Sequence, residues 1–501
     1  MSVVLGVDIG TYETKGVLVR ADGHIVARQR HPHRVTVPEA GFMEHDPESV
    51  WWRGFVGVTA ALLAQSGLPA GQIAAVAVSG IGPCVLPVDA AGNPLRNAIL
   101  YGVDTRAEEQ IAQLNDALGP DEVLRSGTAL TSQSAGPKIN WIEQHEPDVF
   151  ARAARFVTCQ TFITGRLTGR WTIDYATGAY YHPFYDQRTR SWNLHGNPGS
   201  LRVEQLPDLG WSSDIVGEVS GSGAAETGLR AGTPVLVGAP DAAAEALSAG
   251  VTSHRDMMLM YGSSHFLIEV LDAPHNSQNL WPAPFLFRDS YLLAAGTATA
   301  GSFTRWYADL LAPDADGSDE LYSELAARAA QSPPGARGLL ALPYLSGERT
   351  PLYDPGARGA FLGLSMDHGR GDLARAVVES IAHSAAAALR TFEEESLSPR
   401  RIRAIGGGTK NRVWVQAVTD ISGYAQEIVS GPGAAYGDAM LAAGAVGLLD
   451  PRDIGQWVTP SAVLEPRTEL APLYARQREL FEEFYRATRP ILTGLKELRQ
   501  S

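Results

Sequence analysis

Apolar residues near the start of the chain fall into two short runs joined by a polar turn. The run VVLGVDI carries Asp8 near its end, a Gly10-Thr11 turn follows, and a second apolar run begins near Gly16. Continuous apolar runs of this length, bounded by turn residues, are typical of buried strands. Residues 3–19 are therefore predicted to form a buried β-hairpin with one carboxylate at its tip.

The same pattern returns in the second half of the chain. Residues 256–271 contain an apolar strand, a Gly262-Ser263-Ser264 turn and a second apolar strand. When Gly262 is placed on Gly10, Met260 stands opposite Asp8, so the second hairpin lacks the acid. An internal repeat of this kind predicts two duplicated domains, of which only the first keeps the carboxylate.

Strands and helices alternate through both halves, which predicts an α/β protein with central mixed or parallel sheets. We place the domain boundary at Gly250, giving an N-terminal domain over 1–249 and a C-terminal domain over 250–501. The further predicted elements are strands at 73–81, 231–241 and 401–405, and helices over 142–154, from Asp372 onward, after the glycine run at 406–408, and over 474–492.

Composition and charge narrow the classes of partner. The chain has 501 residues, 45% of them hydrophobic, which is enough for a large core and about two to four domains. A net charge of -14 opposes nonspecific binding to nucleic acid or to an anionic membrane. Two cysteines, no basic leader and no run of about 18 uninterrupted apolar residues favour a cytoplasmic protein. The oligomeric state stays open, with a homodimer among the alternatives.

The first hairpin carries groups that suit a phosphate. The backbone N–H groups of the turn, the Thr11 hydroxyl and the Lys15 ammonium can bind phosphate oxygens, while Asp8 can face a hydrated Mg²⁺. An ordinary hairpin with a turn aspartate is the alternative for one such motif, because short motifs recur by chance. Two hairpins of this kind make nucleotide binding the stronger interpretation.

A glycine run follows the strand predicted at 401–405. Gly406, Gly407 and Gly408 precede Thr409-Lys410-Asn411 and a predicted helix. Residues without side chains let a flat ligand or a phosphate approach the backbone beside a helix N-terminus. The alternative is a tight strand-to-helix turn; a Walker A loop is excluded because no GxxxxGK[ST] sequence occurs.

Two more segments place polar side chains at the ends of strands. Asp241 ends an apolar strand and precedes a helix of small residues, where ligands of open α/β sheets gather, although helix capping is the alternative. Tyr101, Asp104 and Arg106 lie in the segment AILYGVDTR and could hydrogen-bond several hydroxyl groups, or form a surface ion pair. The Ser346–Pro351 loop by itself indicates a structural turn.

Taken in order, these motifs resemble the FGGY family of carbohydrate kinases, within the actin/hexokinase/Hsp70-like superfamily. The resemblance spans almost the whole chain: KINWIEQH at 138–145 fits the first family signature from its lysine onward, with Ala135 departing upstream, and residues 359–379 fit the second signature throughout. Residues 342–355 are similar to the family's GERxP segment, which moves that loop away from the structural interpretation. The resemblance implies two actin/ribonuclease H-like domains, each with a central mixed sheet, flanking a cleft for ATP and sugar.

The resemblance also implies roles for individual residues. Asp241 is similar to the catalytic base, and Asp8 with Asp241 to the pair that positions Mg²⁺ through water. The base and the sugar site would lie in the N-terminal domain, and most of the nucleotide site in the C-terminal domain. The implied nucleotide contacts are Gly10, Thr11, Tyr12 and Lys15 on the first hairpin, Gly262 and Ser263 on the second, and Gly301, Arg305, Gly407, Gly408 and Asn411 beyond it.

Departures from the family bear on the substrate. Xylulokinases carry Met-His, and glycerol kinases Arg-Glu, in the stretch matching Gly82-Pro83, and both carry Asn or Gln where this chain has Ala242. The segment AILYGVDTR resembles the xylulokinase WNDGR region, with Tyr101 in place of tryptophan. The implied substrate residues are Gly82, Pro83, Tyr101, Asp104, Arg106 and Asp241.

We therefore expect an ATP- and Mg²⁺-dependent kinase of a small sugar or polyol, with a ketopentose such as xylulose favoured. The missing polar side chains predict weak activity on both D-xylulose and glycerol, and a better substrate that is bulkier or more apolar near Gly82. Kinases of glycerol, erythritol, ribulose or gluconate remain alternatives. A non-kinase ATPase and a sugar-binding regulator on the same fold are alternatives of a different class.

Overall fold

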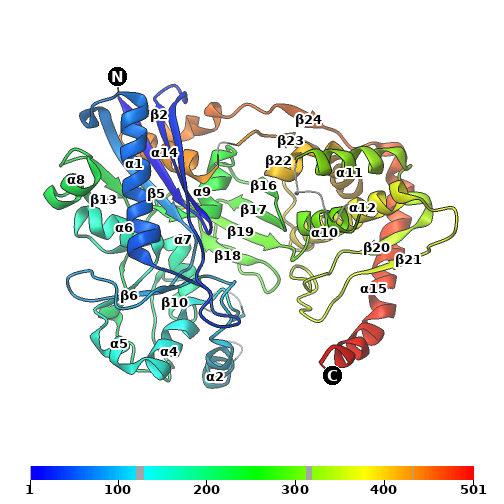
Figure 1. Cartoon of the computed structure of the whole chain (residues 1–501), viewed down its shortest axis with the longest axis horizontal. Helices are drawn as coiled ribbons and strands as arrows, with labels where there is room; N and C mark the ends of the chain where they lie inside the picture. Colours follow the sequence, from blue (N-terminus) through cyan, green and yellow to red (C-terminus); the bar gives the residue numbers. More distant parts are fainter. Residues whose placement is uncertain (1, 120–128, 312–318, 432, 501) are drawn as a thin grey trace. The chain divides into compact units, whose positions relative to one another are not determined.

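The computed structural model describes residues 2–119, 129–311, 319–431 and 433–500 and divides into two compact units (Figure 1). Each unit combines helices with strands of a mixed sheet, which confirms the predicted α/β class. Unit 1 comprises Met1–Ser253, Val270–Leu293 and Pro432–Val458, and unit 2 comprises His254–Glu269, Ala294–Gly431 and Thr459–Ser501.

The sheet of unit 1 has the strand order β13-β14-β5-β1-β2-β3, with β15 also paired to β5. Strand β1 pairs antiparallel with β2 and parallel with β5, so Asp8 stands opposite both Lys15 and Ser79. The hairpin predicted at 3–19 is confirmed. The strands are β1 (Val3–Ile9), β2 (Glu13–Arg20), β3 (Ile25–Pro32), β5 (Ile73–Gly80), β13 (Ile215–Glu218), β14 (Pro234–Leu236) and β15 (Ala239–Pro240).

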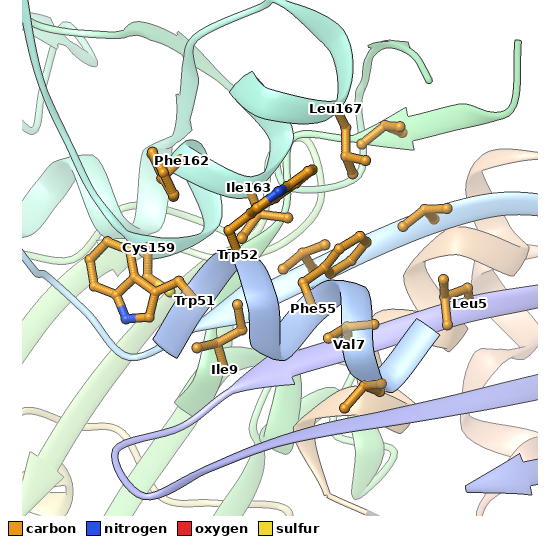
Figure 2. Close-up of a cluster of buried hydrophobic side chains, with 14 of the residues drawn as sticks. Leu5, Val7, Ile9, Trp51, Trp52, Phe55, Cys159, Phe162, Ile163 and Leu167 are labelled. Carbon is orange, nitrogen blue, oxygen red and sulfur yellow. The ribbon is translucent and has the colours of Figure 1, made fainter. Parts of the chain in front are cut away.

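Strand β1 is buried along its whole length, which explains its continuous apolar sequence. On one face, Leu5, Val7 and Ile9 pack in a core with α1 (Arg53–Ser66) and α6 (Cys159–Thr168); Figure 2 shows Trp52 and Phe55 above this face. On the other face lies α14 (Ala434–Ala445), which is drawn in orange in Figure 1.

Two glycines allow α14 to pack closely against β1 and against α9. A Cβ added at Gly6 of β1 would lie 1.9 Å from the Ala435 carbonyl oxygen of α14. A Cβ added at Gly437 of α14 would lie 1.9 Å from the Ala244 carbonyl oxygen of α9 (Asp241–Ser248). Residues without a side chain at both contacts therefore place α14 and α9 against the end of the sheet that carries Asp8.

Two predicted elements of unit 1 are interrupted. The strand predicted at 231–241 forms as β14 and β15, because Gly238 has a φ of 92° and a Cβ there would lie 2.3 Å from the Val78 carbonyl oxygen. The helix predicted at 142–154 forms as α4 (Ala135–His145) and α5 (Pro147–Arg152). The break falls at Glu146 because the residue before a proline avoids the helical conformation.

Shorter elements complete unit 1. They are β4 (Glu44–His45), β6 (Leu86–Val88), β7 (Ala98–Ile99), β8 (Arg155–Val157), β9 (Thr172–Asp174), β10 (Tyr185–Asp186), β11 (Ser191–Trp192), β12 (Asp208–Gly210), α2 (Glu108–Leu118), α7 (Tyr175–Gly178) and α8 (Gly221–Thr227). Within the described ranges, no helix is both long enough and apolar enough to cross a membrane.

Unit 2 contains the central strands of a second sheet, whose order is β18-β19-β17-β16-β22-β23-β24. The predicted second hairpin is confirmed as β16 and β17, paired antiparallel from Met257↔Glu269 to Tyr261↔His265. The strands are β16 (Asp256–Tyr261), β17 (His265–Leu271), β18 (Trp281–Pro284), β19 (Tyr291–Gly296), β22 (Arg401–Ile405), β23 (Gln426–Ile428) and β24 (Ala462–Leu464), beside the small pair β20 (Leu340–Leu342) and β21 (Ala360–Leu362).

The three helices predicted for the second half also form, as α12 (Arg370–Glu394), α13 (Arg412–Ser422) and α15 (Ala471–Gln500). Two further helices, α10 (Gly301–Leu311) and α11 (Asp319–Gln331), were not predicted. Helix α13 is capped by Asn411, whose side chain accepts a hydrogen bond from the Trp414 N–H, so the glycine run leads into a capped helix.

Candidate functional site

The carboxyl ends of three strands in unit 1 meet at one edge of the sheet. Asp8 lies near the end of β1, Ser79 lies beside it near the end of β5, and Asp241 follows β15 as the first residue of α9. Both β1 and β15 run parallel to β5, so their carboxyl ends share an edge. This is the place where ligands of open α/β sheets bind.

The environment of the two aspartates differs from that of ordinary surface carboxylates. Burial raises the pKa of Asp8 to about 8, helped by the charge of Asp241 and opposed by Lys15. Burial likewise raises the pKa of Asp241 to about 7, with the Ala242 N–H opposing this shift and Glu245 adding to it. An aspartate in water has a pKa of about 3.9. The position of Asp241 between buried elements places its pKa near neutrality instead.

Excess negative charge at this edge suits a divalent cation. Asp8, Asp241 and Glu245 repel one another here, and the pKa of Glu245 is raised by burial. Among the described residues, no group of three or more His, Cys, Asp or Glu side chains is arranged to hold a metal directly. A pair of carboxylates that meets Mg²⁺ through water is compatible with this arrangement, because Mg²⁺ keeps several of its waters.

Lys15 supplies the positive charge of the cluster. Its ammonium nitrogen lies 3.1 Å from a Glu13 carboxylate oxygen, and its side chain is 44% exposed. Burial alone would lower the pKa of Lys15, but the negative charges of Asp8 and Glu13 outweigh this and raise it. The ammonium is therefore charged and accessible to an anion at the hairpin.

The turn of the hairpin is ordered yet open. The Gly10 N–H donates to the Glu13 carbonyl oxygen at 3.0 Å, which closes the turn, and the Tyr12 side chain is 62% exposed. Thr11 is partly buried, and its hydroxyl oxygen lies 3.1 Å from the hydroxyl oxygen of Tyr101. The structure thus brings the predicted phosphate residues Gly10, Thr11, Tyr12 and Lys15 together on one hairpin.

Asp438 is a member of this cluster that the sequence analysis did not identify. It is fully buried on α14, and its Oδ2 accepts hydrogen bonds from the Ser79 N–H at 3.1 Å and the Ser79 hydroxyl at 2.7 Å. The Ser79 hydroxyl also lies 3.4 Å from Asp8 Oδ1. Burial raises the pKa of Asp438 well above its usual range. A single acid inside the apolar run AAYGDAMLAAGA was the signal that could have revealed it.

Asp104 and Arg106 pair with each other inside the protein. The Arg106 guanidinium lies 2.8 Å from an Asp104 oxygen and 2.9 Å from Glu44, and it stacks 4.1 Å from the centroid of the Phe42 ring. Both side chains are buried, so this is not a surface ion pair. The pairing fixes the loop after β7 and compensates the charge of Arg106. Contact of either residue with a substrate stays a prediction.

Tyr101 and Lys138 define the rest of this loop. The Lys138 ammonium is fully buried and donates hydrogen bonds of 2.7 Å to the carbonyl oxygens of Leu100, Tyr101 and Ser132. Burial lowers the pKa of Lys138 to about 8. Burial raises the pKa of the Tyr101 hydroxyl, and the nearby charge of Asp241 adds to this. The charge of the candidate base therefore acts on the Tyr101 hydroxyl.

The other predicted substrate residues present little polar surface. Gly82 and Pro83 follow β5 and are joined by a cis peptide bond. A Cβ at Gly82 would lie 3.5 Å from Thr177, which is an ordinary contact distance. Ala242 follows Asp241 and is partly buried. None of these three residues carries a hydrogen-bonding side chain.

Unit 2 contains a cavity of about 370 Å³, a size typical of small-molecule sites. Gly407 borders open space, since a Cβ there would meet nothing within 4 Å, whereas a Cβ at Gly408 would lie 2.5 Å from the Trp414 ring. Arg305 is not among the lining residues; it pairs with Asp309 at 3.1 Å. The lining includes the predicted Gly262, Ser263, Gly301, Gly407, Gly408 and Asn411, together with Tyr261, Thr304, Tyr322 and Trp414, which were not predicted.

Comparisons with known proteins agree with this arrangement. Residues 3–248 match the model of the FGGY family of carbohydrate kinases, N-terminal domain, and residues 257–446 match its C-terminal domain. The chain is 28% identical over 508 residues to the xylulose kinase of Bacillus subtilis (strain 168), and the alignment covers 100% of both chains. It is 26% identical over 516 residues to the gluconokinase of the same organism, and that alignment covers 100% of this chain and 96% of the other. The crystal structure of xylulose kinase from Rhodospirillum rubrum matches with a TM-score of 0.90 and 30% identity, covering 98% of this chain and 99% of that one.

Proposed function

Because the chain belongs to the FGGY family of carbohydrate kinases, we propose that it transfers the γ-phosphate of ATP to a hydroxyl group of a neutral ketopentose or a related polyol. The class of reaction follows from the family: the protein is a phosphotransferase that acts on a sugar hydroxyl. The substrate and the roles of individual residues are the proposal. The observation that carries it is the position of Asp241, at the carboxyl edge of the sheet beside Asp8 and Lys15.

In the proposed reaction, Asp241 accepts the proton of the substrate hydroxyl while the hydroxyl oxygen attacks the γ-phosphorus. The bond between the γ-phosphorus and the β–γ bridging oxygen breaks, and ADP leaves. A base with a pKa near 7 suits this role, because at neutral pH about half of it is ionised and the ionised form accepts a proton readily.

The remaining proposed roles concern ATP. The hairpin turn, with the Thr11 hydroxyl and the Lys15 ammonium, binds phosphate oxygens, and the cavity of unit 2 holds the adenosine moiety. Asp8 and Asp241 are the residues that would hold Mg²⁺, which neutralises phosphate charge when bound.

Charge compensation favours a neutral substrate over a sugar acid. The one cation among the predicted substrate residues, Arg106, is already paired with Asp104 and Glu44. A carboxylate substrate would lack a free partner in this set, and leaving a buried charge unpaired is costly. The similarity to a gluconokinase keeps gluconate as the second candidate to test.

The test is ADP release measured over a panel of ketoses, aldoses, polyols and aldonates. We expect a neutral ketose or polyol to give the highest kcat/KM, and D-xylulose and glycerol to be poor substrates because Gly82, Pro83 and Ala242 supply no hydrogen-bonding side chain. Highest efficiency on gluconate would contradict the proposed neutral substrate. Highest efficiency on D-xylulose would contradict the expected effect of the three missing side chains.

Asp241→Asn tests the proposed base. The substitution keeps the shape of the side chain but removes its ability to accept a proton, so we expect turnover to fall by about 10² to 10⁴ while ATP still binds. Glu245→Gln, one helical turn away on α9, is the matched control and should keep most of the turnover. If Asp241→Asn turns over at the parent rate, Asp241 is not the base.

A further inference from the structure

Thr11 is held from two sides by residues outside its own hairpin. Its carbonyl oxygen lies 3.1 Å from Nε2 of His45, and its hydroxyl oxygen lies 3.1 Å from the Tyr101 hydroxyl. All three residues belong to unit 1. The residue proposed to meet a phosphate is thus bonded to the residue proposed to meet the sugar.

The carbonyl contact has an unambiguous direction. The Trp51 indole N–H can only donate, and it lies 3.0 Å from Nδ1 of His45, so Nδ1 is the acceptor. The ring proton of neutral His45 is then on Nε2, which donates to the Thr11 carbonyl oxygen. His45 is fully buried, and burial lowers its pKa to about 4, so this tautomer persists at neutral pH. The backbone of Thr11 is therefore fixed, and its hydroxyl has a defined position.

The backbone of Tyr101 is fixed in the same way. Its carbonyl oxygen accepts a hydrogen bond of 2.7 Å from the Lys138 ammonium, which also binds Leu100 and Ser132. Because the backbones of Tyr101 and Thr11 are both fixed, the main freedom left to their hydrogen bond is which of the two hydroxyl groups donates the proton. Each hydroxyl donates one proton and accepts others, so either residue can donate when nothing else is bound.

A bound phosphate would decide this direction. Phosphate oxygens are acceptors, so Thr11 would donate its only hydroxyl proton to the phosphate. Its oxygen could then only accept from Tyr101. The Tyr101 oxygen, having donated, would in turn accept a proton from a substrate hydroxyl. Such a chain, running from the sugar through Tyr101 and Thr11 to the phosphate, strengthens each of its hydrogen bonds.

We propose that the hydrogen bond between Tyr101 and Thr11 couples the binding of sugar to the binding of nucleotide. The inference rests on the proposed function, since it needs a sugar at Tyr101 and a phosphate at Thr11. Tyr101 acts here as a positioning residue. Because coupling is reciprocal, each ligand tightens the binding of the other by the same factor.

The experiment measures this factor directly. The dissociation constant of a nonhydrolysable ATP analogue with Mg²⁺ is determined by titration calorimetry, with and without a saturating concentration of the best sugar of the panel. In the parent protein, we expect the sugar to lower the dissociation constant of the analogue by about fivefold or more. A factor of about five is at the lower end of measured couplings. In Tyr101→Phe and in Thr11→Val the factor should fall to within about twofold of one, and the double variant should lose nothing further.

Two controls separate coupling from stability. Thr11→Ser keeps a hydroxyl and should retain the parent factor. Tyr436→Phe removes a hydroxyl that donates to the Gly23 carbonyl oxygen at 2.8 Å, near the turn at the opposite end of β2, and should also retain it. A parent factor near one, or a Tyr101→Phe protein with the parent factor, overturns the inference. A parent protein that phosphorylates no member of the panel overturns the proposed function instead, so the two failures are distinguishable.

Discussion

At the level of single residues, the raised pKa of Asp241 predicts the pH dependence of the reaction. The base is inactive when protonated, and burial raises its pKa to about 7, so kcat/KM for the sugar should rise about tenfold per pH unit below this value and level off above it. Asp8, with a pKa near 8, titrates with it as a coupled pair. A pH profile from 5 to 9 at constant Mg²⁺ tests this.

Glu245 provides the control for the pH profile. Its negative charge adds to the raised pKa of Asp241, so Glu245→Gln should move the midpoint of the profile to lower pH. A profile that is flat down to pH 5 in the parent, or a midpoint that moves upward in the variant, would show that another group limits the rate.

The raised pKa of Asp438 predicts how the stability of the protein depends on pH. Its folded-state pKa lies well above the usual 3.8, so between these two values the folded protein binds more protons than the unfolded chain. The contribution of Asp438 to the free energy of unfolding therefore declines as pH rises from about 4 through the folded pKa. Asp438→Asn mimics the neutral carboxyl, and its stability relative to the parent should increase between pH 5 and pH 8 in urea unfolding.

A surface carboxyl with the opposite shift serves as the control for Asp438. The pKa of exposed Asp22 is lowered, chiefly by a hydrogen bond from the His24 N–H, so Asp22→Asn should not gain relative stability at higher pH. Equal pH dependence in the parent and in Asp438→Asn would mean that Asp438 does not carry this linkage.

The sequence was informative for residues that follow strands and uninformative for residues whose partners are remote. Asp8 and Asp241 could be identified because each stands at the end of an apolar run, and Lys15 because it stands directly before the start of one. The Asp438–Ser79 bond joins positions 359 residues apart, and no local pattern links them. The raised pKa values were equally out of reach, because burial depends on which helices cover the sheet edge.

At the level of elements, the close approach of α14 predicts a strong effect of one methyl group. Gly6→Ala and Gly437→Ala would each place a Cβ 1.9 Å from a carbonyl oxygen of the backbone, which must then shift. We expect each substitution to lower the free energy of unfolding by about 1 to 3 kcal/mol. Urea unfolding followed by circular dichroism measures the change.

Gly57 in α1 is the matched control for this packing. It is exposed in the helix, and a Cβ there would meet nothing within 4 Å, so Gly57→Ala should raise stability by about 0.5 to 1 kcal/mol. Parent-like stability of both Gly6→Ala and Gly437→Ala would show that α14 tolerates a wider spacing than the structure has.

Element types followed from hydrophobic patterning, whereas interruptions followed from packing and local backbone limits. Both hairpins and the strand at 401–405 formed as predicted, because long apolar runs bounded by turn residues leave few alternatives. The strand at 231–241 broke because Gly238 passes close to the neighbouring strand, which the sequence does not record. The helix at 142–154 broke at Pro147, a signal that was present in the sequence.

At the level of the whole molecule, the two compact units are not two consecutive halves of the chain, because each is built from three separate segments. The segment Pro432–Val458 is late in the sequence, yet its contacts place it in unit 1, where α14 packs on β1 and α9. The close contact between Gly6 and Ala435 joins residues more than 400 positions apart, and no periodic pattern in the sequence indicates it. The assignment of sugar and base to residues 1–249, and of nucleotide to residues 250–501, remains a prediction.

This assignment of the ligands to the two parts of the chain can be tested by hydrogen–deuterium exchange with one ligand at a time. Adenosine, which has no phosphate, should slow exchange in the segments that line the cavity of unit 2, namely the β16–β17 turn, the start of α10 and the glycine run, and should leave unit 1 unchanged. The best sugar of the panel should instead protect residues 98–106 and the start of α9 in unit 1. Binding slows exchange where it stabilises backbone hydrogen bonds, so the two patterns should not overlap.

A substitution at Gly407 makes the adenosine result specific. Because a Cβ at this position meets open space, Gly407→Phe should fill part of the cavity without displacing the backbone. We expect this variant to lose protection by adenosine and to keep full protection by the sugar in unit 1. Adenosine protection that survives the substitution would mean that the nucleotide binds elsewhere. Loss of both patterns would mean that Gly407→Phe disturbs the fold, in which case the parent's two separate patterns decide the assignment.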